Sequence, residues 1–212
     1  DDGPEMRLAT LDELRERFER RREFRFIQGE EITDSFEDRP VHVNGLNLAE
    51  RIDPQGGASL RETLQRNIDA VIEQGRRLRR PVLAHVNHPN FRWGLGWEDV
   101  AAVRGERFFE VYNGHSGVRN YGDEEHPSTE RMWDLANARR LGELGLEPLF
   151  GVATDDAHDY LEWGVGRTNP GRGWVVVRAA ALEPHAIVEA MRRGDFYASS
   201  GVELEDVTCD GD

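Results

Sequence analysis

The chain alternates short apolar runs with amphipathic segments of helical spacing, and this order constrains its fold more than any other feature. PVLAHV at 81–86 and LFGVA at 149–153 have the length of buried strands, whereas 60–72 repeats leucine and isoleucine at helical intervals. Strands that alternate with helices tend to pair in parallel, because each helix crosses back over the sheet. The sequence therefore predicts a largely parallel α/β sheet in a single domain, 1–212.

The same reading gives an ordered set of elements. The predicted helices lie at 10–22, after the capping residue Ser59, and at 97–105, 128–145 and 182–194. The predicted strands lie at 24–33 (ending in a Gly-Glu-Glu turn), 41–48, 81–86, 107–115, 149–158, 174–179 and 195–201. Chemistry in parallel α/β folds gathers beyond the carboxyl ends of the strands, so the residues at those ends are of most interest.

Composition narrows the functional classes. The formal net charge is −14, which argues against a general nucleic-acid binder, and no apolar stretch approaches the roughly 20 residues of a membrane span. All 27 basic residues are arginine. Cys209 is the only cysteine, so no disulfide framework is expected, and a reducing cytoplasm suits the chain. The absence of an initiator methionine suggests a piece of a longer protein, with 202–212 as the start of a C-terminal extension.

Histidines and carboxylates gather at the predicted strand ends. Five of the seven histidines lie on or just after a predicted strand: His42, His85, His88, His115 and His158. Glu30, Glu31, Glu110, Asp155 and Asp156 occupy similar positions. Imidazole and carboxylate together suit zinc, manganese or iron. In Asp156-Ala-His158 the alternation lets both side chains reach one side of an extended strand end.

Two interpretations of these polar ends remain open at this point. They form either a metal site or a polar barrel mouth whose residues hydrogen-bond within their loops. Asn113 and His115 could orient a substrate or the ligands. Arg92, Arg119 and Arg172 lie in predicted loops, where a guanidinium could grip a phosphate in two bonds, although an ordinary surface position explains each of them as well.

The order of these motifs resembles the polymerase and histidinol phosphatase (PHP) superfamily, and in particular a bacterial subgroup of PHP-domain proteins. The likeness covers essentially the whole chain through the phrases FIQGEEITD, PVHVNGLNL, HVNHPNFRWG, FFEVYNGH, STERMWDL, ATDDAHDY, NPGRGWVVVRA and GDFYASSGVEL. The resemblance implies a distorted (β/α)7-type barrel that binds one to three divalent metal ions and hydrolyses phosphoesters.

Carried over by position, the resemblance assigns the metal ligands. Glu31 matches the bridging carboxylate and His42 the next ligand. Either His85 or His88 matches the following histidine. Asp156 and His158 match the final Asp-x-His pair, which leaves Asp155 as a supporting residue. The catalytic set implied is Glu31, Asp156 and His158.

The chain also departs from the family pattern. The family opens with a His-x-His strand and a later Asp-His pair, and neither occurs here. The resemblance then implies a barrel incomplete at its N-terminus. It also implies one well-formed metal position, held by Glu31, His42 and His85 or His88.

The leading functional hypothesis is a metal-dependent phosphoesterase that uses a metal-activated water on a small phosphorylated substrate. A metal-dependent hydrolase of a C–N or C–O bond is one alternative. A non-catalytic PHP-like module that lacks a full metal site is the other.

Overall fold

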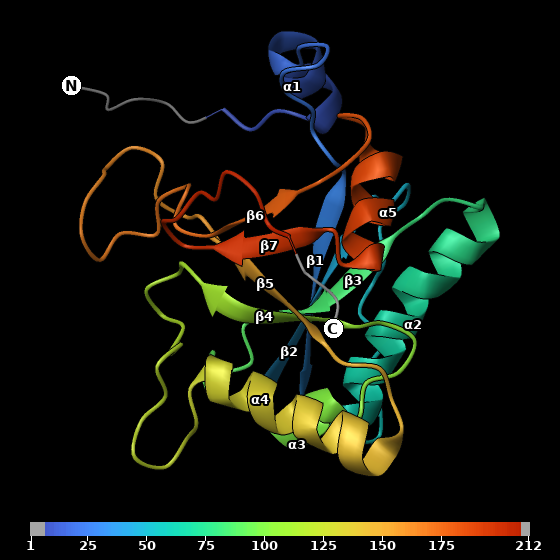
Figure 1. Cartoon of the computed structure of the whole chain (residues 1–212), viewed down its shortest axis with the longest axis vertical. Helices are drawn as coiled ribbons and strands as arrows, with labels where there is room; N and C mark the ends of the chain where they lie inside the picture. The colour runs from blue at the N-terminus through green and yellow to red at the C-terminus, as the bar shows by residue number, and fades with distance from the viewer. Residues whose placement is uncertain (1–6, 209–212) are drawn as a thin grey trace.

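The computed structural model describes residues 7–208 and shows one five-stranded sheet and a separate pair of strands (Figure 1). The larger sheet contains β1 (Gly29–Phe36), β2 (Arg39–Leu46), β3 (Leu83–Val86), β4 (Phe108–Asn113) and β5 (Phe150–Thr154), and the pair contains β6 (Trp174–Val177) and β7 (Phe196–Ser199). The α-helices are α1 (Leu11–Phe18), α2 (Leu60–Leu78), α3 (Trp97–Ala101), α4 (Thr129–Arg139) and α5 (Pro184–Arg193). Cys209 and the end of the predicted C-terminal extension lie outside the described residues.

Each predicted element has a counterpart in the structure, but the predicted barrel is wrong. The sheet order is β1-β2-β3-β4-β5, in which β1–β2 and β2–β3 pair antiparallel while β3–β4 and β4–β5 pair in parallel. Within residues 7–208 the sheet stays open, and β6 and β7 form an antiparallel pair of their own. The architecture is therefore mixed α/β rather than a distorted (β/α)7-type barrel.

The tight connection between β1 and β2 explains part of this difference. Only Glu37 and Asp38 separate the two strands, and Glu37 has a positive φ of 56°. A two-residue loop can join only antiparallel neighbours, since a parallel pair needs a long crossover. The strand also begins later than predicted, so Glu30 and Glu31 lie inside β1 rather than in a turn.

The five-stranded sheet buries apolar side chains on both faces. One face packs against α2, α3 and α4 through a large core that includes Ile32, Val43 and Phe109. The other face carries a smaller core, with Leu83 and Phe108, under α5, β6 and β7. We call this second face the inner face (Figure 1). The smaller core fills the inner face near the amino ends of β4 and β5, and the polar strand ends lie beyond it.

The helix ends follow local sequence signals. Ser59 accepts a hydrogen bond from the Glu62 amide, which confirms it as the cap of α2. The segment predicted as one helix over 128–145 divides into α4 and a π-helical turn, η1 (Arg140–Leu144), which Gly145 closes with a φ of 59°. No helix in residues 7–208 combines the length and apolarity needed to cross a membrane.

Packing of α2 on the sheet should supply much of the stability. Leu64 in α2 is 1% exposed within the larger core. Leu64→Ala is expected to lower the free energy of unfolding by about 2–5 kcal/mol, because truncation leaves a cavity in a close-packed core. Chemical denaturation with urea measures this loss. Leu141→Ala, at a position 62% exposed, is the matched control and should change stability little; equal effects at both positions would contradict this packing.

Candidate metal centre

Strand alternation places Glu31 and His42 on the inner face. The β1–β2 register opposes Thr33 to His42 and Glu31 to Asn44, so these four side chains share that face. Glu30 lies on the opposite face, where its carboxylate accepts a hydrogen bond of 2.9 Å from the Ile52 amide. The two neighbouring glutamates therefore face different environments, and only Glu31 reaches the strand-end histidines.

His88 completes a compact cluster from the loop after β3. Its Nε2 lies 3.2 Å from Glu31 Oε1 and 3.3 Å from His42 Nδ1, and that His42 nitrogen lies 2.8 Å from the same Glu31 oxygen. Among the described residues, Glu31, His42 and His88 form the group of metal-binding side chains whose ligand atoms all lie within 4.8 Å of one another. Three atoms from separate chain segments thus converge on one point.

The cluster is electrostatically coupled. Hydrogen bonds from His42 and His88 hold the pKa of the Glu31 carboxyl far below its usual range, so this group stays ionised. Burial opposes a charge on His88, yet its bond to Glu31 and the nearby carboxylates of Glu110 and Asp156 raise its pKa overall. A concentration of negative potential beside two imidazoles favours a cation at this point.

Two further residues hold the cluster in place. Asn87 donates from its side-chain amide to Glu31 Oε1 at 2.8 Å. Glu110, only 1% exposed, accepts the His88 backbone amide at 2.8 Å and the Thr154 hydroxyl at 2.5 Å. Burial raises the pKa of Glu110. These contacts fix the backbone from which His88 extends.

Asp156 and His158 lie beside the cluster rather than within it. The Asn113 amide group donates to Glu110 at 2.9 Å and to Asp156 at 3.2 Å, so a continuous hydrogen-bonded path joins Asp156 to the backbone of His88. His158 Nδ1 lies 2.8 Å from the Asp156 carbonyl oxygen. A carbonyl can only accept, so Nδ1 carries the proton and Nε2 of neutral His158 is a free acceptor. Asp155 instead accepts the Gly171 amide and supports a loop.

A row of rings connects the predicted histidines along one rim. The ring centroids are 4.9 Å apart for His42 and His88, 5.1 Å for His88 and Phe91, 6.4 Å for Phe91 and His115, and 4.9 Å for His115 and His158. His158 is the most open of these, with its side chain 63% exposed. The histidines along this rim therefore differ in their exposure to solvent.

His85 has a different environment from His88. It lies inside β3, opposite Asn44, and is 6% exposed. Its Nε2 is buried without a hydrogen-bond partner among the described residues, and it does not join the convergent cluster. Burial, together with the positive charge of His88, lowers the pKa of His85 to about 4.

The four residues predicted to contact substrate fall into two groups. Asn113 is buried and committed to positioning, since its oxygen accepts the His115 amide while its NH₂ group holds Glu110 and Asp156. Arg172 bonds to the Gly164 carbonyl and to Asn169, which ties it to its own loop. His115 lies on the rim of rings. Arg92 is exposed, with its guanidinium 5.4 Å from the centre of the Phe91 ring.

Sequence reasoning missed two residues that build this site and gave a third no specific role. Asn87 and Phe91 flank His88 in the phrase HVNHPNF, and their proximity to a predicted ligand is the signal that could have indicated them. Glu110 was recognised as a strand-end carboxylate but not as a buried acceptor that organises the loops around it. Phe109 precedes Glu110 in a run of apolar residues, and such a run indicates a strand that is buried on both faces. A carboxylate on such a strand needs several hydrogen-bond donors.

Comparison with known proteins assigns no family. The chain matches no protein-family model, and a comparison with curated proteins gives no match. The resemblance to the PHP superfamily therefore rests on the motifs of the sequence.

The buried His85 should make stability depend on pH. Its pKa is about 4 in the folded protein and about 6.5 in an unfolded chain, so the unfolded state binds the extra proton between these values. Above about pH 6.5 His85 is neutral in both the folded and the unfolded state, so it does not reduce stability. The free energy of unfolding should decline by about 3 kcal/mol as the pH falls to 4. Urea denaturation at a series of pH values across this range measures the decline.

The His85→Phe variant supplies the comparison, because its ring does not titrate. Its loss of stability between pH 6.5 and 4 should be smaller than that of the wild type by the contribution of His85. The same substitution at His185, an exposed position in α5, should preserve the wild-type pH dependence. Parallel curves for the wild type and His85→Phe would contradict the assignment.

Proposed function

We propose that Glu31, His42 and His88 hold a divalent transition-metal ion and that the protein is a metal-dependent hydrolase of phosphoesters. One observation carries this proposal, namely the convergence of two imidazole nitrogens and one carboxylate oxygen within 4.8 Å. The order of motifs that resembles the PHP superfamily supports it independently.

The donor set fits such an ion. Two nitrogens and one oxygen suit zinc, manganese or iron better than calcium, which prefers oxygen ligands alone. The three atoms lie 2.8–3.3 Å apart, close to the roughly 3.3 Å between ligand atoms of a tetrahedral zinc. Three protein ligands are also the number found in catalytic zinc sites, which leave a further position for water or substrate.

The fit extends to the residues around the ligands. Asn87 donates to Glu31 and would orient its carboxylate, as supporting residues do in known metal sites. The ionised state of Glu31 is the one that binds a cation, and it persists at neutral pH because hydrogen bonds lower its pKa. The side chain of Glu31 is 37% exposed, so the cluster is accessible to a ligand.

When bound, a divalent ion would lower the pKa of a coordinated water and polarise a phosphoryl oxygen. The surrounding side chains have complementary roles. His158, with a free Nε2 in its neutral form, is suited to accept or return a proton. Arg92 supplies a guanidinium near the rim that could pair with a phosphoryl group. Asn113 and Glu110 fix the positions of Asp156 and of the His88 backbone through their hydrogen bonds.

Metal binding should distinguish the two adjacent glutamates. Glu31→Gln is expected to weaken binding of zinc or manganese by at least about 100-fold, because it removes a charged ligand. Isothermal titration calorimetry of the metal into chelator-treated protein measures this change. Glu30→Gln alters the same chemistry on the opposite face of β1 and should leave the affinity unchanged. Equal losses in both variants, or metal binding retained in Glu31→Gln, would contradict the site.

The activity itself is tested with a panel of substrates. With zinc or manganese present, the protein should hydrolyse a phosphomonoester or phosphodiester, and Glu31→Gln should abolish turnover while Glu30→Gln retains it. Release of phosphate or of a chromogenic alcohol measures the reaction. Hydrolysis confined to amides or carboxyl esters would indicate a C–N or C–O hydrolase. Metal binding without turnover of any substrate would indicate a non-catalytic module.

A further inference from the structure

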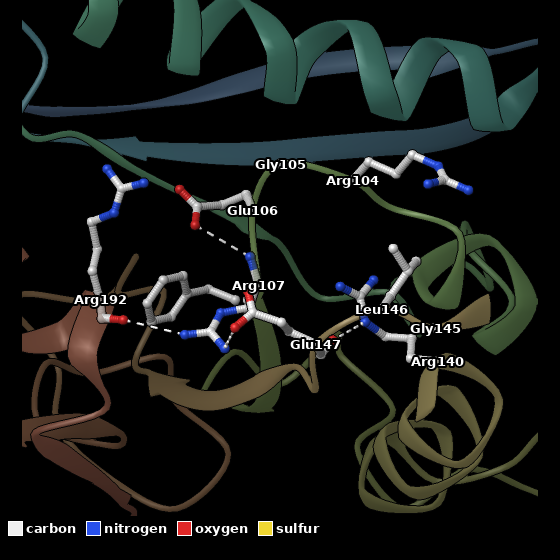
Figure 2. Close-up of a pocket in the computed structure, with 10 residues that line it drawn as sticks. Arg104, Gly105, Glu106, Arg107, Arg140, Gly145, Leu146, Glu147 and Arg192 are labelled. Carbon is white, nitrogen blue, oxygen red and sulfur yellow. Dashed lines mark hydrogen bonds and ion pairs between the residues drawn. The ribbon is translucent and has the colours of Figure 1, made fainter. Parts of the chain in front are cut away.

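A charged cavity lies at the opposite end of the strands from the candidate metal centre. It has a volume of about 360 Å³ and opens at the amino ends of β4 and β5, where Phe108 begins β4 (Figure 2). Asn113, the last residue of β4, belongs to the network around the metal cluster. The lining residues most relevant to its chemistry are Arg104, Arg107, Arg140, Arg192, Glu106 and Glu147.

The cavity is positively charged within an acidic protein. Four arginines and two glutamates line it, although the whole chain carries a net charge of −14. Glu106 is only 5% exposed, and burial raises its pKa. Its carboxylate accepts the backbone amides of Ala84 and Arg107, so it already has partners. The arginines are therefore incompletely neutralised by the protein itself.

Arg140 is the most buried arginine of the cavity that forms no ion pair among the described residues. It is 2% exposed, and its guanidinium donates to three backbone carbonyls: from Nε to Glu147 at 2.6 Å, and from Nη1 to Val103 at 2.7 Å and Ala101 at 3.2 Å. Within residues 7–208 it forms no ion pair, and its Nη2 has no hydrogen-bond acceptor. These carbonyls solvate the guanidinium but do not cancel its charge, so Arg140 contributes a positive charge to the wall of the cavity.

The backbone at Arg140 is also unusual. Arg140 begins the π-helical turn η1, and Gly145 ends that turn at the wall of the cavity. π-Helical turns are rare and often occur at functional sites. Figure 2 shows Arg140 on one side of the cavity and Arg107 and Arg192 on the other, with Glu147 between them.

Arg107 is held in position to act with Arg140. Its guanidinium lies 4.4 Å from the centre of the Phe150 ring, and its Nη2 donates to the Arg192 carbonyl at 3.3 Å. It also pairs with Glu147 at 3.2 Å. The positive charge of Arg107 adds to burial in lowering the pKa of Arg140. Glu147 lies between Arg107 and Arg140 and offsets part of their repulsion, and a bound anion would offset the rest.

We propose that this cavity binds a phosphate-sized oxyanion, with Arg107 and Arg140 as its principal ligands. Planar guanidinium groups bind phosphate oxygens through paired hydrogen bonds, and four arginines around one cavity suit a dianion. The anion is either free phosphate or the phosphoryl group of a small molecule. The site shares no residue with the metal cluster, so this proposal can be tested independently of the proposed hydrolase activity.

Calorimetric titration of inorganic phosphate into chelator-treated protein at constant ionic strength tests this site. The wild type should bind phosphate, and Arg107→Gln should weaken the affinity by about tenfold or more, the scale of one charge-assisted hydrogen bond. Arg131→Gln removes the same charge from an exposed position on α4 and should leave the affinity unchanged. Arg140→Gln should also weaken binding; if that variant fails to fold, Arg107→Gln decides the question.

Two further comparisons locate the anion and identify its source. Glu31→Gln should retain phosphate binding, because its substitution affects only the metal cluster. Tighter binding of glycerol 3-phosphate than of inorganic phosphate would identify a phosphorylated small molecule as the ligand, and the reverse order would identify free phosphate. No binding at millimolar phosphate, unchanged binding in Arg107→Gln, or loss of binding in Glu31→Gln would each overturn the proposal.

Discussion

The burial of the Glu110 carboxylate is the constraint on which the arrangement of the site depends. At 1% exposure this group needs several donors, and it obtains them from the Thr154 hydroxyl, the Asn113 amide group and the His88 backbone amide. These donors come from β5, from the end of β4 and from the loop after β3. Satisfying one buried carboxylate therefore fixes three separate segments relative to one another, and His88 is aimed at Glu31 and His42 as a consequence.

The two polar regions of the molecule occupy opposite ends of the same strands. A single apolar core around Leu83 and Phe108 fills the inner face between them and separates the acidic, imidazole-rich rim from the arginine-lined cavity. This layer of apolar side chains keeps the two groups of charges apart, and their attraction weakens with distance. The sheet thus has a rim rich in imidazoles and carboxylates at one end and an arginine-lined cavity at the other.

Local elements followed from the sequence more closely than their assembly did. The Ser59 cap, the close of the helical segment at Gly145 and every predicted strand have counterparts in the structure, because caps and periodicity act over a few residues. The parallel barrel was wrong because strand direction depends on the connections. The two-residue turn at Glu37 and Asp38 makes β1 and β2 antiparallel. The inner face, which a closed barrel would have enclosed, is instead covered by β6, β7 and α5.

The sequence by itself determined which residue types stand at the strand ends. Glu31 faces away from Glu30 because the structure places both inside β1, where successive side chains alternate. Only the tertiary structure decided which histidine meets Glu31 and His42. His85 lies within β3 and is enclosed by neighbouring strands, whereas His88 lies beyond the strand, where the bond from its backbone to Glu110 sets its direction. The physical reason is that a side chain's face follows from local backbone geometry, while its partners depend on segments that are distant in sequence and meet only after folding.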